Sequence, residues 1–314
     1  MSSIYSGVAG APVTPFNAKG AVDYDTFAKQ INFLIENGVR LIAHPMQIGE
    51  AVSLTEAERR ELAKVLASSV GRRVPTFVNV SHAGTDIAAE LAAHATKSGN
   101  TGVAMMAPYH WRPGQRALVE HFTAVADAAG GEFILCNDPE AVGVDLGTDT
   151  LEKLIDRLSG LVAIMDASFD MRIFTDICEL VARKGKPVAV YGSGEMLLST
   201  MPLGARGCFS ICSEVAPKLT QALYQICATG VYSRAQPLQF KLRRLLKVLL
   251  HNYPANIKYA MELLDRPVGN TRRPVMPPTA DEKKWIKSEL TQLGIFDDEP
   301  AGWDVRRKAG KQAA

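Results

Sequence analysis

LVAIMDASFD, residues 161–170, starts as an apolar run and opens into a polar turn of small residues. The run Leu161–Ile164 predicts a short buried strand, because it is apolar and is followed at once by turn-forming residues. In a parallel α/β protein, active-site residues gather at the carboxyl ends of such strands. We therefore expect Met165 and the residues after it to border a functional site.

Strand-like and helix-like segments alternate on both sides of this stretch. About eight strand–helix units follow one another within roughly 210 residues, which favours a closed (β/α)₈ barrel over an open sheet. The sequence does not favour a nucleotide-binding fold, because no GxGxxG motif follows the first strand and no GxxxxGKS motif occurs. The other predicted strands are 8–13, 41–44, 74–80, 103–107, 133–136, 188–191 and 208–211. The predicted helices between them are 24–37, 85–98, 115–129, 150–158, 173–183 and 196–201, together with a helix that starts after Thr55, where Thr55 and Glu58 are spaced for a capping box.

Beyond Gly230 the pattern becomes helical only. Amphipathic segments at 236–250, 257–264 and 281–293 predict helices that pack on the barrel or on a neighbouring subunit. We predict a barrel over residues 1–229, a C-terminal helical domain over 230–296 and a flexible tail over 297–314.

Composition narrows the classes of function. The 314 residues carry a net charge of +2 with dispersed lysines and arginines, so we expect neither a nucleic-acid nor a membrane partner. Met1–Tyr5 lacks the regions of a signal peptide, and the five cysteines are odd in number and suit a reducing compartment. We predict a cytoplasmic location. Cys208-x3-Cys212 has no second pair that would complete a zinc site.

Several motifs occur in order along the chain: GAPVTPF at 10–16, Gly49-Glu50 followed by LTEAER at 54–59, Pro108-Tyr109, Asn137-x-Pro139 and Gly204-Ala205-x-Gly207. Together they resemble dihydrodipicolinate synthase and N-acetylneuraminate lyase. This family includes aldolases, dehydratases and hydratase-aldolases that act on 2-oxo acids. The resemblance runs from about Gly7 to Leu293 and implies a (β/α)₈ barrel with a C-terminal helical domain, assembled as a homo-oligomer (dimer or tetramer). It implies no cofactor.

The residues that carry the family's chemistry differ in this chain. The resemblance implies that Met165 stands in place of the Schiff-base lysine and Cys136 in place of the proton-relaying tyrosine. The paired hydroxyl residues, a second tyrosine and a carboxylate-gripping arginine are replaced by Gln47 and Ile48, His110 and Ala141.

The residues themselves argue against a Schiff base as well. We find no lysine at the carboxyl end of any predicted strand, and Lys258, for example, lies in the appended helices. Schiff-base catalysis needs a poised amine, and methionine is not nucleophilic enough to substitute for one.

Other polar residues lie at the predicted strand exits. These residues, which include His44, His82 and His110, allow three interpretations. They could form a metal site, or His110 and Cys136 could act as acid/base catalysts without covalent capture of the substrate. In the third interpretation they are a polar rim around a pocket that binds a metabolite or nothing. We predict no metal, because the histidines come from separate loops without i,i+4 spacing. A buried, inert Cys136 is favoured over a thiolate nucleophile. The predicted substrate contacts are Gln47, Ile48, Asn79, Met165 and Ser210, and the predicted rim is His44, His82, Asn137 and Asp138.

These observations predict a divergent lyase that acts on a small oxo- or hydroxy-acid-like metabolite without a lysine Schiff base. The alternative is a catalytically inactive homologue that binds a small molecule or pairs with an active relative. A cation in place of the lost arginine would favour the lyase, because an acid substrate needs a cationic partner. Arg112 and Arg206 are the nearest such residues in the sequence.

Overall fold

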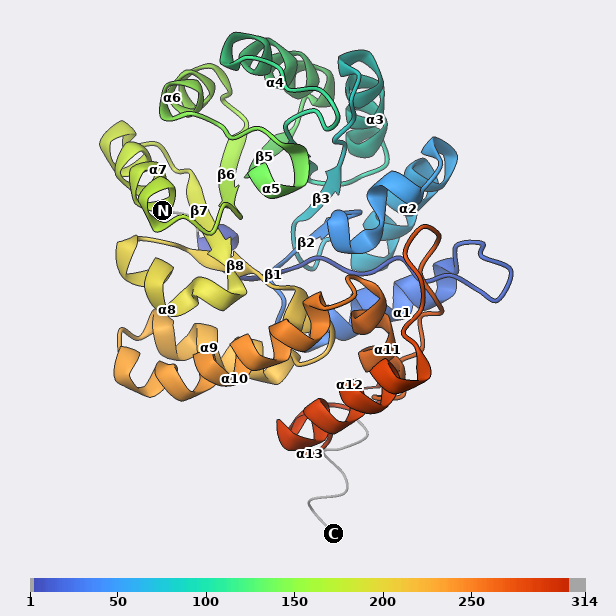
Figure 1. Ribbon diagram of the computed structural model, residues 1–314. Helices are drawn as coiled ribbons and strands as arrows, with labels where there is room; N and C mark the ends of the chain where they lie inside the picture. Colours follow the sequence, from blue (N-terminus) through green and yellow to red (C-terminus); the bar gives the residue numbers. More distant parts are fainter. Residues whose placement is uncertain (1–2, 305–314) are drawn as a thin grey trace.

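The computed structural model describes residues 3–304 and shows a closed barrel of eight parallel strands in sequential order (Figure 1). The predicted (β/α)₈ barrel is thereby confirmed. Its strands are β1 Gly7–Gly10, β2 Leu41–His44, β3 Thr76–Asn79, β4 Gly102–Met106, β5 Glu132–Asn137, β6 Leu161–Asp166, β7 Ala189–Ser193 and β8 Gly207–Phe209.

Helices surround the strands, as the alternating pattern predicts. The helices of the barrel are α1 Tyr24–Glu36, α2 Glu56–Val70, α3 Thr85–Lys97, α4 Gln115–Ala129, α5 Pro139–Val142, α6 Thr148–Arg157, α7 Met171–Lys184, α8 Leu197–Thr200 and α9 Pro217–Ala228. The C-terminal helices are α10 Tyr232–Leu250, α11 Ala255–Glu262, α12 Ala280–Gln292 and α13 Ile295–Asp298.

Local sequence signals account for several of these boundaries. Thr55 and Glu58 form a reciprocal capping box at the start of α2, as predicted. The closure between β1 and β8 needs glycine, because a Cβ atom at Gly207 would meet the carbonyl oxygen of Gly7 at 1.9 Å. A side chain there would force the two strands apart and open the barrel.

The barrel differs from the predicted pattern in two places. Helix α9 was not predicted from the sequence, and the helix predicted over 196–201 is divided into the short helices η4 Gly194–Met196, α8 and η5 Met201–Leu203. Pro202 lies inside η5, and because proline lacks a backbone N–H it does not extend the regular turns of α8. Within residues 3–304, no helix is both long and apolar enough to cross a membrane.

The prediction of a flexible tail from residue 297 differs from the structure over 297–304. The Glu299 side chain is buried, and its carboxylate accepts hydrogen bonds from the backbone N–H groups of Lys218 and Leu219 at 2.9 and 2.8 Å. These N–H groups lie in the first turn of α9 and have no partner within the helix, so the carboxylate satisfies them and fixes the segment. Residues 305–314 lie outside the described part of the chain.

Candidate active site

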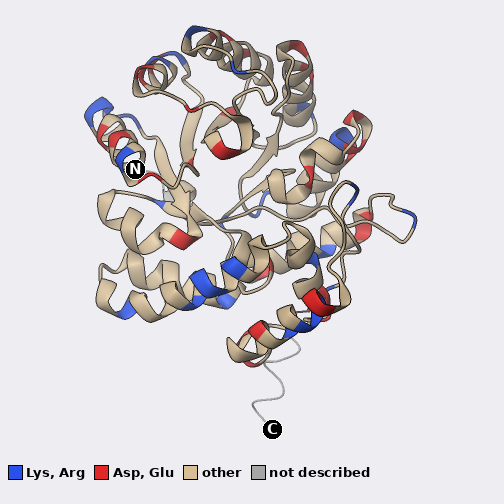
Figure 2. Ribbon diagram, viewed as in Figure 1, with Lys and Arg blue, Asp and Glu red and all other residues tan. Residues whose placement is uncertain are grey.

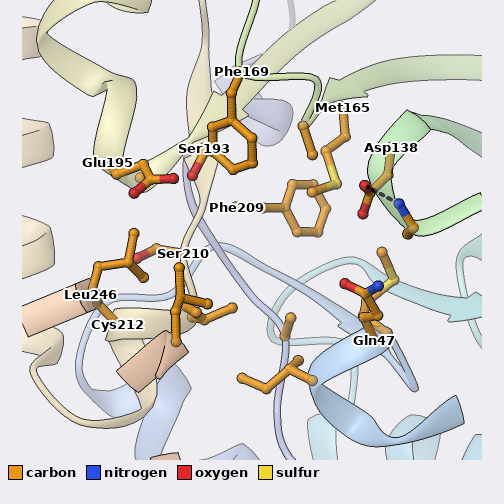
Figure 3. A pocket seen from close by; sticks show the side chains of 18 of the residues that line it. Gln47, Asp138, Met165, Phe169, Ser193, Glu195, Phe209, Ser210, Cys212 and Leu246 are labelled. Atoms are coloured by element: carbon orange, nitrogen blue, oxygen red, sulfur yellow. Dashed lines mark hydrogen bonds between the residues drawn. The ribbon is translucent and has the colours of Figure 1, made fainter. Parts of the chain in front are cut away.

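A cavity of about 590 Å³ opens at the carboxyl ends of the strands, where the LVAIMDASFD stretch predicts a functional site. Every strand except β3 supplies a lining residue from its last positions or from the loop that follows it. One wall comes from α10, whose Leu242, Leu246 and Leu250 recur at helical spacing and therefore face the same side. The C-terminal helices thus complete a site that the barrel begins (Figures 1 and 3).

Met165 lies in the cavity wall at the end of β6 (Figure 3). It is in register with Cys136 of β5 on one side and with Tyr191 of β7 on the other. Met165 and Cys136 are therefore neighbours, and both line the cavity. A thioether and a thiol occupy the two positions that the resemblance assigns to lysine and tyrosine.

The Cys136 thiol is poorly suited to act as a nucleophile. Its side chain is buried, and burial, reinforced by the negative charge of Asp138, raises its pKa to about 12. Since the thiolate is the reactive form, the neutral thiol behaves as a small apolar group. This geometry supports the inert interpretation of Cys136.

Three carboxyl groups line the cavity. Asp138 is the N-cap of α5, where its Oδ1 accepts a hydrogen bond from the Ala141 N–H at 3.2 Å. Burial raises the pKa of the Asp138 carboxyl, and the charges of Glu140 and Asp166 add to this effect. The other two carboxyl groups are those of Glu140, in α5, and Glu195, in the turn after β7.

Glu195 differs from the other two carboxyl groups because it has a cationic partner. Arg243 of α10 donates to its Oε2 at 2.7 Å, and the Arg243 side chain is half exposed. Burial nevertheless raises the pKa of Glu195, against the opposing effect of Arg243. Figure 2 shows basic positions along α10 and acidic positions at α5. No lysine, arginine or histidine is among the lining residues of the cavity in the described chain.

The predicted rim histidines His44 and His82 lie outside the cavity lining. His44 is buried, its Nδ1 lies 3.0 Å from the Pro12 carbonyl oxygen, and burial lowers its pKa to about 3. It is a neutral core histidine that packs against Phe27. His82 accepts the N–H of Gly84 on its Nδ1 at 3.0 Å, within its own loop.

His110, predicted as a proton carrier, is exposed and does not line the cavity. Its backbone is left-handed, with φ of 74°, and its ring packs edge-on against Trp111. The three histidines thus leave adjacent strands in different directions. Among residues 3–304, no cluster of three or more His, Cys, Asp or Glu side chains is arranged to hold a metal ion.

Two predicted polar contacts have structural partners instead. The Asn79 Oδ1 accepts hydrogen bonds from the backbone N–H and the hydroxyl of Ser81, and β3 does not reach the cavity. Asn137 donates to Asp166 Oδ1 at 2.8 Å and accepts from the Leu146 N–H at 3.0 Å. Both asparagines hold the loops after their strands. The predicted site residues that do line the cavity are Gln47, Ile48, Cys136, Asp138, Met165 and Ser210.

Arg112 and Arg206, which were considered above as cationic partners for an acid substrate, do not line the cavity. Arg112 lies in the exposed loop after β4, close to Gly143. Arg206 directly precedes β8 and therefore lies at the opposite end of the barrel, where its backbone pairs with Gly7 and Val190. Lys258 of α11 is buried in an ion pair with Glu50, at 2.6 Å, and does not line the cavity either.

Sequence reasoning missed much of the cavity wall. Phe169, Ser193, Glu195 and Phe209 line it, and Phe169 is held in a left-handed backbone conformation with φ of 58°. Two signals could have located them: the segment Gly192–Glu195 directly follows a predicted strand, and Phe209 lies in one. The α10 leucines needed the tertiary structure, because an apolar helix face does not say what it covers.

Comparisons with known proteins agree with this architecture. A family model described as the dihydrodipicolinate synthetase family matches residues 4–293. A 4-hydroxy-tetrahydrodipicolinate synthase of Bartonella tribocorum is 30% identical over 92% of this chain and 98% of its own length. A synthase of the same name from Methanocaldococcus jannaschii is 29% identical over 93% of this chain and 100% of its own length.

Solved structures lead to the same family. Dihydrodipicolinate synthase from Aquifex aeolicus superposes with a TM-score of 0.87 at 27% identity, over 93% of this chain and 99% of its own. A prophage protein of the dihydrodipicolinic acid synthase family from E. coli K12, solved in complex with pyruvate, gives a TM-score of 0.88 at 26% identity, with the same coverage. The chain therefore belongs to the dihydrodipicolinate synthetase family.

Proposed function

We propose that this protein is a lyase of its family that acts on a small oxo- or hydroxy-acid-like metabolite without forming a Schiff base with lysine. The observation that carries the proposal is that the cavity lining of the described chain contains no amine and has Met165 at the end of β6. A Schiff base forms when an uncharged amine attacks a carbonyl carbon and water leaves. A thioether has no proton to lose and cannot form the C=N bond.

Carboxyl groups are the side chains in this cavity best suited to move a proton. Burial raises the pKa of both Asp138 and Glu195 toward the range in which a carboxyl group can give and accept a proton. Cys136 holds its proton too tightly for this role, and His110 lies outside the cavity. We therefore propose Asp138 as the principal acid/base group.

The relatives support a small carbonyl compound as the class of substrate. The E. coli relative was solved in complex with pyruvate, and the cavity here is large enough for a small metabolite. The homo-oligomeric assembly and the cytoplasmic location remain predictions.

One observation favours the alternative, a homologue that binds a metabolite without turning it over. Neither of the two proton carriers predicted from the sequence can transfer a proton in the cavity of this chain. The Cys136 thiol keeps its proton, and His110 does not line the cavity. Binding without turnover would then be the function of the cavity.

Borohydride trapping with pyruvate, read by intact mass, tests the absence of a Schiff base. We expect no adduct on the natural protein, whereas Met165→Lys restores an amine at the end of β6 and gains a single reducible adduct. Met276→Lys, at an exposed position, is the control for non-specific trapping. An adduct on a cavity lysine of the natural protein would overturn the proposal.

A second assay separates the lyase from the binding protein. Small oxo- and hydroxy-compounds are incubated with the natural protein and with Asp138→Asn, and product formation is followed by proton NMR. Turnover that is lost in Asp138→Asn supports the lyase. Saturable binding with no turnover of any compound supports the alternative.

A further inference from the structure

We infer that the cavity takes an uncharged small oxo- or hydroxy-compound, such as an ester or amide, and discriminates against a free carboxylate. The inference rests on the proposed function for the kind of reactive group, and it places a neutral ester or amide where that proposal has an acid group. It follows from the charge of the cavity, from its neutral polar groups and from its apolar walls.

The charged groups of the cavity all have the same sign. Asp138, Glu140 and Glu195 line it, and no cationic side chain does so within the described chain. Glu195 and Arg243 neutralise each other, whereas within residues 3–304 neither Asp138 nor Glu140 forms an ion pair. A bound carboxylate would lose part of its hydration and meet the unpaired carboxyl groups of Asp138 and Glu140 without a counter-ion, which disfavours its charged form. An uncharged ligand avoids this cost.

Neutral polar groups are available to such a ligand. The Gln47 amide and the hydroxyl groups of Ser193, Ser210 and Tyr253 line the cavity. In the described chain, none of these four side chains makes a hydrogen bond to another protein group. They can therefore donate to and accept from a carbonyl, hydroxyl or amide group of the ligand.

The arrangement of the side chains fits a ligand with an apolar body. Figure 3 places Met165 and Phe209 between Asp138 on one side and Ser193 and Glu195 on the other. An apolar middle flanked by polar groups suits a small molecule whose hydrogen-bonding groups lie at its ends. In such a molecule the end near Asp138 must be neutral, because Asp138 and Glu140 have no counter-ion within the described chain.

Methionines give a direct readout of binding. Met46, Met106 and Met165 line the cavity, whereas Met261 is buried in α11 and Met276 is exposed elsewhere. The full-length protein, labelled with ¹³C at its methionine methyl groups, is titrated with pyruvate, methyl pyruvate and pyruvamide. These compounds share one carbon skeleton and differ in charge. We expect the three cavity methyl signals to shift on titration with the ester and the amide, with dissociation constants at least tenfold lower than that of pyruvate. The methyl signals of Met261 and Met276 should not move.

Charge-neutralising variants test the cause of this preference. Asp138→Asn, Glu140→Gln and Glu195→Gln, singly and combined, are expected to tighten the binding of pyruvate and to leave that of methyl pyruvate within about twofold. The matched control replaces three carboxylates on outer helices, with Glu61→Gln, Glu90→Gln and Asp281→Asn. The single variants keep the comparison available if the combined variant does not fold.

The two proposals fail in different ways. Pyruvate that binds the natural protein as tightly as its ester, or an ester and an amide that both leave the cavity methyl signals unmoved, would overturn the inference about charge. Neither result creates a borohydride adduct, so the absence of a Schiff base would stand. An adduct on the natural protein would overturn the proposed function instead.

Discussion

Two regions of this molecule hold several carboxyl groups each, and they differ in whether these groups have cationic partners. At the junction between the barrel and the C-terminal helices, each carboxylate has a cation or a hydrogen-bond donor. Lys258 Nζ lies 2.6 Å from Glu50 Oε1 and also donates to the Thr14 carbonyl at 2.8 Å. In the cavity, Asp138 and Glu140 have no such cation within the described chain.

The junction uses two further acidic residues to join the segments. Arg272 donates to both carboxylate oxygens of Glu58, at 2.8 and 2.6 Å, in a bidentate pair. Glu214 accepts from the Gln30 Nε2 at 2.6 Å. These side chains contact one another and do not line the cavity.

The two regions differ in whether a charged group already has a partner in the protein. A paired charge fixes one segment against another, and removing its partner leaves an expensive unpaired group. An unpaired carboxyl group at the wall of a cavity is available to a ligand or to a proton. The same contrast separates Lys258 from the cavity: its amine is paired with Glu50 and lies outside the cavity lining.

The largest effect is expected from breaking the junction. Lys258→Met leaves Glu50 buried without its cation and should lower the free energy of unfolding by about 3–5 kcal/mol, measured by urea denaturation. Lys284→Met, which removes an exposed partner of Asp281, is the control and should have little effect. Adding Glu50→Gln to Lys258→Met should restore part of the loss. A loss as small as that of the control would show that the junction does not depend on this pair.

An intermediate effect is expected from the pH dependence of Glu214. Burial raises its pKa to about 8, despite the Gln30 hydrogen bond and the charge of Arg266. The folded state therefore holds a proton that the unfolded state releases, so stability is highest below the ordinary glutamate pKa and falls as the pH rises toward 8.

Glu214→Gln removes this titration while keeping an oxygen that accepts from Gln30. We expect the variant to gain roughly 1–3 kcal/mol relative to the natural protein between pH 5 and pH 8.5, measured by denaturation at each pH. Glu262→Gln, at an exposed position of α11, is the control. Parallel curves for Glu214→Gln and the natural protein would contradict the assignment.

The smallest effect is expected in the cavity. Asp138→Asn keeps an N-cap for α5 and removes a charge that burial disfavours, so at pH 7.5 it should raise the free energy of unfolding by up to about 1 kcal/mol. Asp170 also caps a helix, but its hydrogen bonds with Arg172 lower its pKa to about 2. Asp170→Asn should therefore destabilise slightly. If Asp138→Asn and Asp170→Asn changed the free energy of unfolding in the same direction, the contrast between a paired and an unpaired carboxylate would be contradicted.

The sequence by itself determined the barrel and the place of its site. Periodicity, the capping box at Thr55 and the ordered motifs are local signals, and regular alternation of strands and helices leaves few other ways to pack. Met165 could be placed at a cavity because a strand end is recognisable from the apolar run before it. Gln47 and Ile48 were found from the resemblance, as the residues before Gly49-Glu50, and Ser210 from its place in the predicted strand 208–211.

Only the tertiary structure decided which residues near the strand ends face the cavity. His44, His82 and His110 all lie at such ends, yet one is in the core, one is bonded within its loop and one is exposed. Side-chain direction depends on the path of each loop, which local sequence does not specify. The wall from α10 and the docking of Glu299 on α9 also join segments far apart in the chain. Such contacts form only when the whole chain packs, so no local pattern contains them.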